Sequence, residues 1–229
     1  MTGVSPLIAS SAVRIMTSTL QRSGSRLKRL PVTDRVAAIR AALGRAAHQT
    51  SDFDLNPDTV LPEGRVLRPA GVLAPIIEQE GQLRLLLTKR SSALKHHPGQ
   101  IAFPGGKQDK GDTDVTAAAL REAREEIGLP EGIVDVLGTL PIHETVTGFS
   151  VTPVIGFVRD TFEVRPEPGE VEEVFSVPLD YVMNTDNFLI ESRRWRGTRR
   201  HYFAVPCGPY YIWGATARML RAWADLMTP

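Results

Sequence analysis

The sequence has little cysteine and no long apolar run. Cys207 is the single cysteine among 229 residues, so a disulfide within the chain is excluded and a reducing compartment is expected. Its neighbours are apolar and aromatic, which favours a packed thiol over a nucleophile. No apolar segment approaches the ~20 residues that a transmembrane helix needs. These absences exclude a disulfide scaffold and a protein that spans a membrane with helices.

An excess of charge of one sign is also lacking, because 27 Lys and Arg residues stand against 26 Asp and Glu residues. A formal net charge of +1 gives no global field that attracts nucleic acid or an anionic membrane. We therefore expect neither as a partner, and an anionic small-molecule substrate must be held by a local cluster of charge. The oligomeric state stays open between monomer and homodimer.

Acidic residues are absent from the first 33 residues, which are rich in Ser and Thr. The basic residues of this stretch are Arg14, Arg22, Arg26, Lys28 and Arg29. We expect residues 1–31 to form a basic, poorly ordered arm. The expected location is the cytoplasm, or the mitochondrial matrix if the arm is a transit peptide.

Residues 32–69 are predicted to form a helix and a linker that pack on the main body. Apolar residues recur at helical spacing from residue 32 to 47, and Thr33 or Asp34 can cap this helix. Residues 50–69 are polar and contain three prolines and a glycine, which is typical of a linker.

The main body, residues 70–229, alternates strand-length apolar runs with helices. Runs at 71–79 and 82–90 flank Glu80-Gly81, which suits a tight hairpin turn, and a loop is expected over 91–106. The best helix spans 115–127 and ends at Gly128. Further strands are expected at 134–140, 151–158, 174–177, 188–195 and 201–205, and a helix at 213–227. This order predicts an α/β fold with a mixed sheet covered by helices.

Three glutamates give the helix at 115–127 its chemical interest. Glu122, Glu125 and Glu126 stand at i, i+3 and i+4, so they share one face and repel one another. Hard carboxylate oxygens in a cluster are what Mg²⁺ or Mn²⁺ binds. The alternative is a solvated acidic face balanced by Arg121 and Arg124.

The loop before the helix favours a ligand site over a solvated face. Gly105-Gly106 lets backbone approach a ligand closely and turn into the acidic helix. Asp109 and Asp112 add carboxylates, and Lys107 and Lys110 add positive charge. A glycine turn leading into a helix of carboxylates suits a metal-bound diphosphate.

The segment from Gly105 to Leu129, GGKQDKGDTDVTAAALREAREEIGL, resembles the Nudix box, G-x5-E-x7-R-E-U-x-E-E-x-G-U. Gly106, Arg121-Glu122, Glu125-Glu126 and Gly128-Leu129 match its fixed positions. The sequence departs from the pattern in having Asp112 for the first glutamate, one extra residue before Arg121, and Ala123 for a bulky aliphatic.

The resemblance implies a Nudix-type α/β/α sandwich with a mixed β-sheet, and a hydrolase that cleaves diphosphates with Mg²⁺ or Mn²⁺. Glu122 and Glu126 would be the principal metal ligands, and Glu125 a third ligand or the base that deprotonates water. Asp112 would be an outer ligand, a role its departure from the pattern puts in question. Arg121 would orient the carboxylates by ion pairing.

A longer resemblance concerns the substrate. The segment LLTKRSSALKHHPGQIAFPGG, residues 86–106, looks like the extra signature of the coenzyme A pyrophosphatase branch. Residues 146–158 and 210–220 look like later segments of the same branch. This implies hydrolysis of coenzyme A or acyl-coenzyme A to 3′,5′-ADP and 4′-phosphopantetheine or its acyl form. The candidate substrate-binding residues are Arg90, Lys95, Gly105, Gly106 and Lys107.

Other interpretations stay open at this point. The substrate of a Nudix pyrophosphatase can also be a dinucleotide or a nucleoside triphosphate, and a Nudix fold can serve as a non-catalytic binding module. The base can come from a downstream acid among Glu170, Glu172 and Glu173. His143 and Glu144 can line the site. Tyr210, Tyr211 and Trp213 can stack on adenine, although core packing suits them better.

Overall fold

The computed structural model describes residues 30–61, 63–195 and 197–228. Most of the basic arm, residues 1–29, therefore lies outside the described residues. The helices are α1 (Val32–Leu43), α2 (Val115–Ile127), α3 (Leu179–Val182) and α4 (Ala215–Met227), with short 3₁₀ turns at Glu131–Ile133 and Thr185–Asn187. The strands are β1 (Thr50–Ser51), β2 (Arg68–Gln79), β3 (Gln82–Arg90), β4 (Ile101–Ala102), β5 (Gly105–Lys107), β6 (Val134–Thr139), β7 (His143–Glu144), β8 (Phe149–Val158), β9 (Val171–Pro178), β10 (Leu189–Trp195), β11 (Thr198–Cys207) and β12 (Tyr210–Trp213). No helix in these ranges is long and apolar enough to cross a membrane.

The main sheet is mixed, as predicted. β2 and β8 run parallel at its centre, while β3 pairs antiparallel with β2 and β9 pairs antiparallel with β3. β5 pairs antiparallel with the first residues of β2, and β6 with β8. The predicted β2–β3 hairpin turns at Glu80 and Gly81, whose φ angles of 52° and 73° are those of a two-residue turn.

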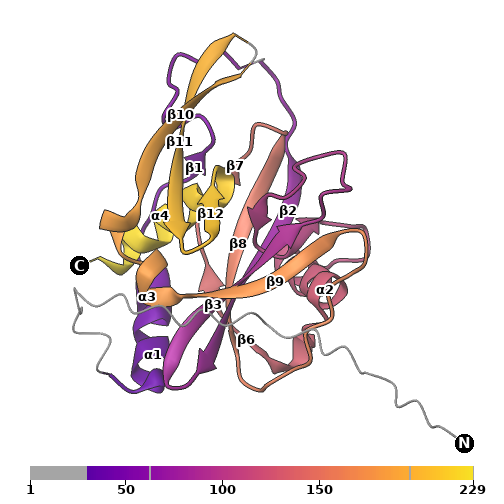
Figure 1. Ribbon diagram of the computed structural model, residues 1–229, viewed down its shortest axis with the longest axis vertical. Coiled ribbons are helices and arrows are strands. Elements are labelled where there is room, and N and C mark those ends of the chain that lie inside the picture. The colour runs from indigo at the N-terminus through magenta and orange to yellow at the C-terminus, as the bar shows by residue number, and fades with distance from the viewer. Residues whose placement is uncertain (1–29, 62, 196, 229) are drawn as a thin grey trace, which may run out of the picture.

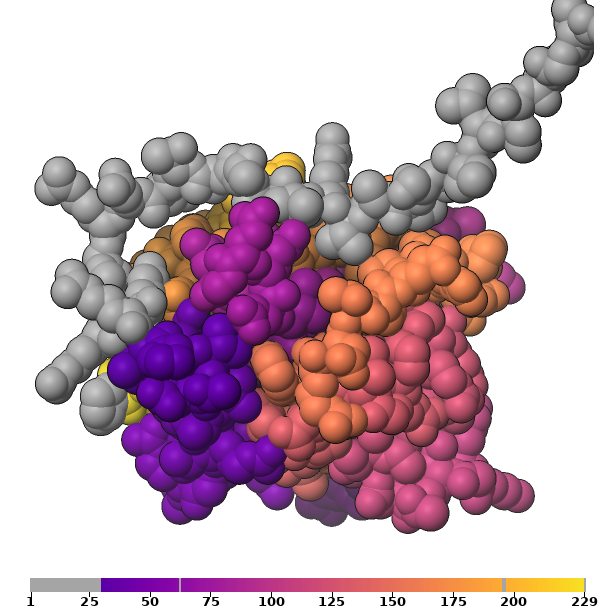
Figure 2. Space-filling view, turned by 90° about the horizontal axis from the view of Figure 1, so that it is seen from below, coloured from indigo at the N-terminus to yellow at the C-terminus, as the bar shows by residue number. Residues whose placement is uncertain are grey.

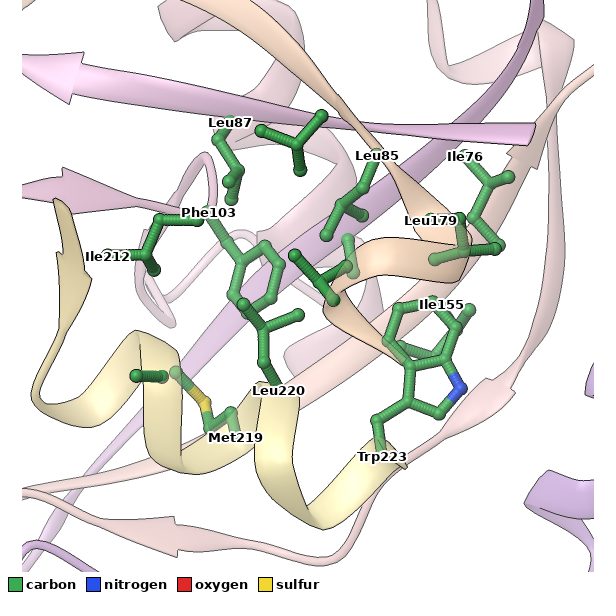
Figure 3. Packing of buried hydrophobic residues seen from close by; sticks show 14 of the residues in the cluster. Ile76, Leu85, Leu87, Phe103, Ile155, Leu179, Ile212, Met219, Leu220 and Trp223 are labelled. Atoms are coloured by element: carbon green, nitrogen blue, oxygen red, sulfur yellow. The ribbon is translucent and has the colours of Figure 1, made fainter. Parts of the chain in front are cut away.

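Two hydrophobic clusters, one on each face of this sheet, give the molecule three layers. Residues of α2 pack with Leu73, Leu86 and Val154 on one face. Ile39 of α1 belongs to the cluster on the other face. There Trp223 of α4 packs with Ile76, Leu85 and Ile155 (Figure 3). Since successive strand residues point to opposite faces, these alternating sets fill both sides. The result is the α/β/α sandwich that the sequence predicts (Figure 1).

The N-terminal helix lies at the opposite side of the molecule from α2. Arg35 of α1 forms an ion pair with Asp180 of α3 at 2.9 Å, and Ile39 enters the core. In the view from below, the indigo residues of α1 and the pink residues around α2 lie on opposite sides (Figure 2). Helix α1 therefore supports the sheet without contributing to the acidic face of α2.

Several predicted boundaries were wrong. α1 ends at Leu43 instead of residue 47, and its N-cap is Pro31, whose carbonyl accepts the N–H groups of Asp34 and Arg35. Helix α4 begins at Ala215, because Trp213 belongs to β12, which pairs with β11. The expected linker contains β1, and the expected loop 91–106 contains β4 and the start of β5. β1 and β5 pair with the distant strands β7 and β2, which local sequence does not reveal, while β4 pairs with the preceding strand β3.

Local signals at both ends set the predicted bounds of α2. The side chain of Asp114 accepts the N–H of Ala117 as N-cap, and Gly128 ends the helix with φ 72°. Gly71 of β2 lets the helix approach the sheet, because a Cβ at Gly71 would lie 2.0 Å from the carbonyl oxygen of Val115. Helix α2 is thus seated directly on the backbone of β2.

Gly71→Ala tests this seating. The added methyl group meets backbone atoms of α2 that cannot move alone, so the free energy of unfolding should fall by about 3 kcal/mol. Gly132→Ala is the matched control, because its Cβ would meet nothing within 4 Å and should change stability by less than about 1 kcal/mol. Urea denaturation measures both, and equal stability of the two variants would contradict close contact between α2 and β2.

Candidate functional site

The three glutamates of α2 differ sharply in burial. Glu126 is 5% exposed and belongs to the face of α2 that packs on the sheet. The side chain of Glu122 is 17% exposed, and that of Glu125 is 50% exposed. The three glutamates of the predicted common face are therefore buried to different degrees. Glu122 and Glu126 line its inner side, and Glu125 lies at its solvent edge.

Glu126 is held by the glycine turn. The backbone N–H of Gly105 donates to Oε2 of Glu126 at 3.2 Å. The pKa of Glu126 is nevertheless raised to about 7, mainly by burial and in addition by the neighbouring carboxylates of Glu122 and Glu170. Only the Gly105 hydrogen bond and the more distant charge of Arg90 favour the ionised form. Glu126 is thus a buried acid for which nearby positive charge is insufficient.

Glu122 packs against the next glycine. A Cβ at Gly106 would lie 2.5 Å from Oε1 of Glu122 and 2.6 Å from its Cδ. Burial raises the pKa of Glu122, while the Arg121 guanidinium opposes this shift. The missing side chain of Gly106 is therefore what leaves space for this carboxylate, a finer role than the close approach predicted for Gly105 and Gly106.

Arg121 forms ion pairs with Asp112, Glu122 and Glu125, which is the kind of arrangement that the resemblance implies. Its Nε and Nη2 donate to the two oxygens of Asp112 at 3.0 Å each, a bidentate pair. Its Nη1 donates to Glu122 at 3.0 Å and to Glu125 at 2.9 Å. Hydrogen bonding to Arg121 holds the pKa of Asp112 below its usual range. In this arrangement Asp112 positions Arg121, and both of its carboxylate oxygens are engaged.

The acids suit a cation that the substrate helps to bind. Among the described residues, no three His, Cys, Asp or Glu side chains converge on one point. Mg²⁺, however, is commonly held by one or two carboxylates together with water and substrate phosphates. Glu122 and Glu126 supply two hard oxygen donors, of which Glu126 has little positive charge nearby, so their chemistry fits Mg²⁺ or the similar Mn²⁺.

Of the three downstream acids, Glu170 is the one whose charge acts on this pair. Its charge contributes to raising the pKa of both Glu122 and Glu126. Glu172 instead accepts from Nζ of Lys89 at 2.6 Å, and Glu173 accepts from the hydroxyl of Tyr210 at 2.7 Å. Loop position alone did not separate these acids, and their hydrogen-bond partners do.

The predicted substrate-binding cations differ in how far their charge acts on the acids. Arg90 ends β3, its charge acts on Glu126, and its buried Nε has no hydrogen-bond partner among the described residues. Lys95 is exposed in the loop after β3. Lys107 follows the glycine turn, exposed, and pairs with Asp109 at 3.2 Å. Arg90 is thus the cation most closely coupled to the buried carboxylates.

The remaining candidates have structural partners. His143 is fully buried and hydrogen-bonds Thr50 at 2.9 Å and Asp52 at 3.2 Å, which fastens β1 to β7. Glu144 pairs with Arg65. Tyr210 stacks on Phe175 with ring centroids 3.6 Å apart. Tyr211 is exposed. The ring of Trp213 packs edge-to-face on the ring of Tyr202.

Among known protein families, the NUDIX domain profile matches residues 67–199 of this chain. The chain is 38% identical to an uncharacterized Nudix hydrolase NudL of Enterobacter sp. (strain 638), over 73% of this chain and 93% of that one. It is 42% identical to the NudL of Escherichia coli O6:H1, over 67% of this chain and 80% of that one.

Solved structures of the same family are also similar. A Nudix hydrolase from M. smegmatis, RenU, is 26% identical with a TM-score of 0.44, covering 53% of this chain and 83% of its own. The NUDIX domain of Shewanella oneidensis NrtR, solved with ADP ribose, is 18% identical with a TM-score of 0.42, covering 56% of this chain and 82% of its own.

Glu126→Gln should stabilise the protein in the presence of a chelator. Since the pKa of Glu126 is raised to about 7 in the folded protein, the folded state retains a proton that the unfolded state releases at lower pH, and stability falls as pH rises toward 7. Gln keeps an acceptor for Gly105 and removes the buried charge. At pH 8 with EDTA, the free energy of unfolding should rise by about 1–3 kcal/mol.

The gain should vanish near pH 4.5, where the folded protein carries Glu126 protonated. Urea denaturation at both pH values measures this difference, and Glu125→Gln, at an exposed position, serves as the control without such a gain. Equal stability of wild type and Glu126→Gln at pH 8 would contradict an uncompensated buried carboxylate.

Gly106→Ala should damage the site while sparing the fold. Its Cβ displaces only the end of the Glu122 side chain, so stability should change by less than about 1 kcal/mol. The displaced carboxylate should weaken Mn²⁺ binding roughly tenfold or more, as measured by electron paramagnetic resonance titration. Gly111→Ala, whose Cβ would meet nothing within 4 Å, is the control. Unchanged Mn²⁺ affinity in Gly106→Ala would remove Glu122 from the metal site.

Proposed function

Because the chain belongs to the Nudix hydrolase family, we propose that it hydrolyses the diphosphate of coenzyme A or acyl-coenzyme A. Water adds to one phosphorus and the bridging P–O bond breaks. The products are 3′,5′-ADP and 4′-phosphopantetheine, or the acyl form of the latter.

The observation that carries this proposal is the hydrogen bond from Gly105 to Glu126. The segment that resembles the coenzyme A branch, residues 86–106, begins on β3 and ends at this glycine turn. Arg90, at the end of β3, acts electrostatically on the same glutamate. The substrate-recognition segment is therefore joined to the acids at both of its ends, which supports a shared role for them.

Within the proposal, Glu122 and Glu126 hold the divalent cation, which when bound neutralises charge on the phosphate oxygens. Arg121 keeps Glu122 in position and is itself held by Asp112. Glu170, whose charge acts on the acid pair, accepts the proton of the attacking water. Glu125 forms ion pairs with Arg121 and Arg124, so its carboxylate positions these arginines. It lies farther toward solvent than Glu122 and Glu126.

Basic residues at the end of β3 and in the segment that follows it supply charge for the 3′-phosphate of coenzyme A. Arg90 and Lys95 lie on the segment that leads to the glycine turn, and Lys107 follows it. A planar guanidinium such as that of Arg90 binds phosphate through paired N–H groups. The unpartnered Nε of Arg90 is consistent with a donor that the substrate completes.

Replacing a carboxylate should abolish turnover. Glu122→Gln and Glu126→Gln remove a cation ligand, so kcat with coenzyme A should fall by about a thousandfold or more. Glu131→Gln, an exposed ion-pair partner of Arg124, should retain turnover as the matched control. Chromatography of the products with Mg²⁺ or Mn²⁺ gives the readout. Turnover of NADH or deoxynucleoside triphosphates but not of coenzyme A would sink the substrate assignment while leaving the hydrolase intact.

A substrate pair isolates the recognition of the 3′-phosphate. Arg90→Gln and Lys95→Gln should each raise KM for coenzyme A about tenfold, since a charge-assisted hydrogen bond is lost. They should change KM for dephospho-coenzyme A, which lacks that phosphate, by less than about twofold. An equal loss with both substrates would place the side chain elsewhere, for instance in support of Glu126.

A further inference from the structure

The basic loop after β3, residues 91–100, closes back on Arg90. The N–H of Arg90 donates to the carbonyl of Gln100 at 3.0 Å, and the carbonyl of Arg90 accepts the N–H of Gly99 at 3.1 Å. The N–H of Gln100 donates to the carbonyl of His97 at 3.2 Å, so residues 97–100 form a turn with Pro98 and Gly99 at its centre. The loop therefore returns His97 to the neighbourhood of Arg90.

His97 has a backbone conformation that few side chains accept. Its φ is 54°, in the left-handed region, and Glu80 in the β2–β3 turn is the one other described non-glycine residue with a positive φ. Asparagine, aspartate and histidine are the side chains found there most often. Uncommon backbone of this kind gathers at ligand-binding sites. The conformation of His97 is thus a reason to ask what its ring binds.

Groups from three segments surround the imidazole of His97. The side chain of Gln100 hydrogen-bonds the ring, Arg90 and His96 act on it as cations, and Asp52, just after β1, acts on it as an anion. Partial burial lowers the pKa of His97, and the charges of Arg90 and His96 lower it further, while Asp52 and Gln100 oppose the shift. His97 is still exposed to solvent, so a ligand can reach it.

An anion between Arg90 and His97 would change this balance. A proton on His97 places a second positive charge beside Arg90, which is unfavourable in the free protein. A bound phosphate favours the protonated ring, because its oxygens accept hydrogen bonds from both side chains. The buried Nε of Arg90, which has no hydrogen-bond partner among the described residues, is a donor that the same phosphate would satisfy.

We propose that His97 binds the same 3′-phosphate as Arg90 and takes up a proton when it does so, which makes the recognition of coenzyme A stronger as pH falls. The inference rests on the proposed function, since it assigns a second donor to the phosphate subsite of that function. The proton comes from water, is held on the imidazole while the phosphate is bound, and returns to water when the product leaves. No covalent bond of the substrate changes in this step.

The bound phosphate and the proton on His97 favour each other, which fixes the sign of the pH dependence. The phosphate raises the pKa of His97 in the complex above its lowered value in the free protein. Affinity therefore rises as pH falls through the pKa of the complex, and it levels off below the pKa of the free protein. Because a phosphate monoester itself titrates near pH ~6, a variant that cannot titrate at position 97 is needed to identify the ring.

Binding of 3′,5′-ADP, the proposed product that carries the 3′-phosphate, is the first measurement. Isothermal titration calorimetry of the full-length protein at pH 7, in two buffers of different ionisation enthalpy, counts the protons taken up on binding. Wild type should take up more protons than His97→Asn, by roughly half a proton. Asparagine accepts the left-handed backbone and keeps a polar side chain, but it does not titrate. With 5′-AMP, which lacks the 3′-phosphate, the two proteins should agree.

Steady-state kinetics separate a charge on the phosphate from support of the loop. The KM for coenzyme A of His97→Asn, divided by that of wild type, should rise about threefold or more between pH 8 and pH 6.5. The same ratio for dephospho-coenzyme A, and the ratio of kcat values, should stay within about twofold. His96→Asn, at the exposed neighbouring position, should keep the wild-type pH dependence. A purely structural role of His97 would raise KM equally at both pH values and for both substrates.

Equal proton uptake by wild type and His97→Asn would overturn the inference, and so would a KM ratio for coenzyme A that does not change with pH. Failure of the proposed function looks different, because coenzyme A would then not be hydrolysed at pH 8 by the wild type. The calorimetric comparison decides the role of His97 in either case, since it uses no turnover.

Discussion

The contact between a glycine turn and two carboxylates of α2 is the constraint on which the site depends. Gly105 donates its N–H to Glu126, and the missing side chain of Gly106 leaves space for Glu122. The turn is held in place because β5 pairs with β2, with Gly106 opposite Gly71. Gly71 in turn admits α2 onto the sheet. The glycines that allow the helix to dock therefore also set the distance between the acids and the segment of residues 86–106 that ends at the glycine turn.

Charge around these acids is compensated on one side only. Arg121 serves the outer acids, with a bidentate bond to Asp112 and single bonds to Glu122 and Glu125. Glu126 lies inside, where burial raises its pKa to about 7. A fold that keeps such a carboxylate is less stable than it could be, which is a common feature of functional sites. The electrostatic deficit is what a divalent cation would supply.

Two loops that carry opposite charge meet beside the acids. The N–H of Ser91, at the start of the basic loop, donates to the carbonyl of Glu170 at 2.8 Å. Lys89 and Glu172 form a second link between the same segments. The segment that carries Arg90 and Lys95 is thereby tied to the segment that carries Glu170, whose charge acts on Glu122 and Glu126. In the proposed function, these contacts would couple phosphate recognition to proton transfer.

Local signals in the sequence were sufficient for the elements that they bound directly. Gly128 is adjacent in sequence to the helix that it ends, and Glu80-Gly81 lies within its own hairpin, so α2 and the β2–β3 turn were predicted correctly. The motif also brought Arg121, Glu122 and Glu126 together as candidates. The sequence alone therefore determined the fold class, the acidic helix and the family.

Only the tertiary structure decided how those residues divide their tasks. Helical spacing puts Glu122, Glu125 and Glu126 on one broad face. Packing of α2 on the sheet, however, buries Glu126 and leaves the side chain of Glu125 half exposed. The strands β1 and β5 pair with β7 and β2, and the place of Glu170 likewise depends on partners far along the chain. Pairing of this kind is set by the packing of the whole molecule, because backbone hydrogen bonds and desolvation act between residues that no local pattern connects.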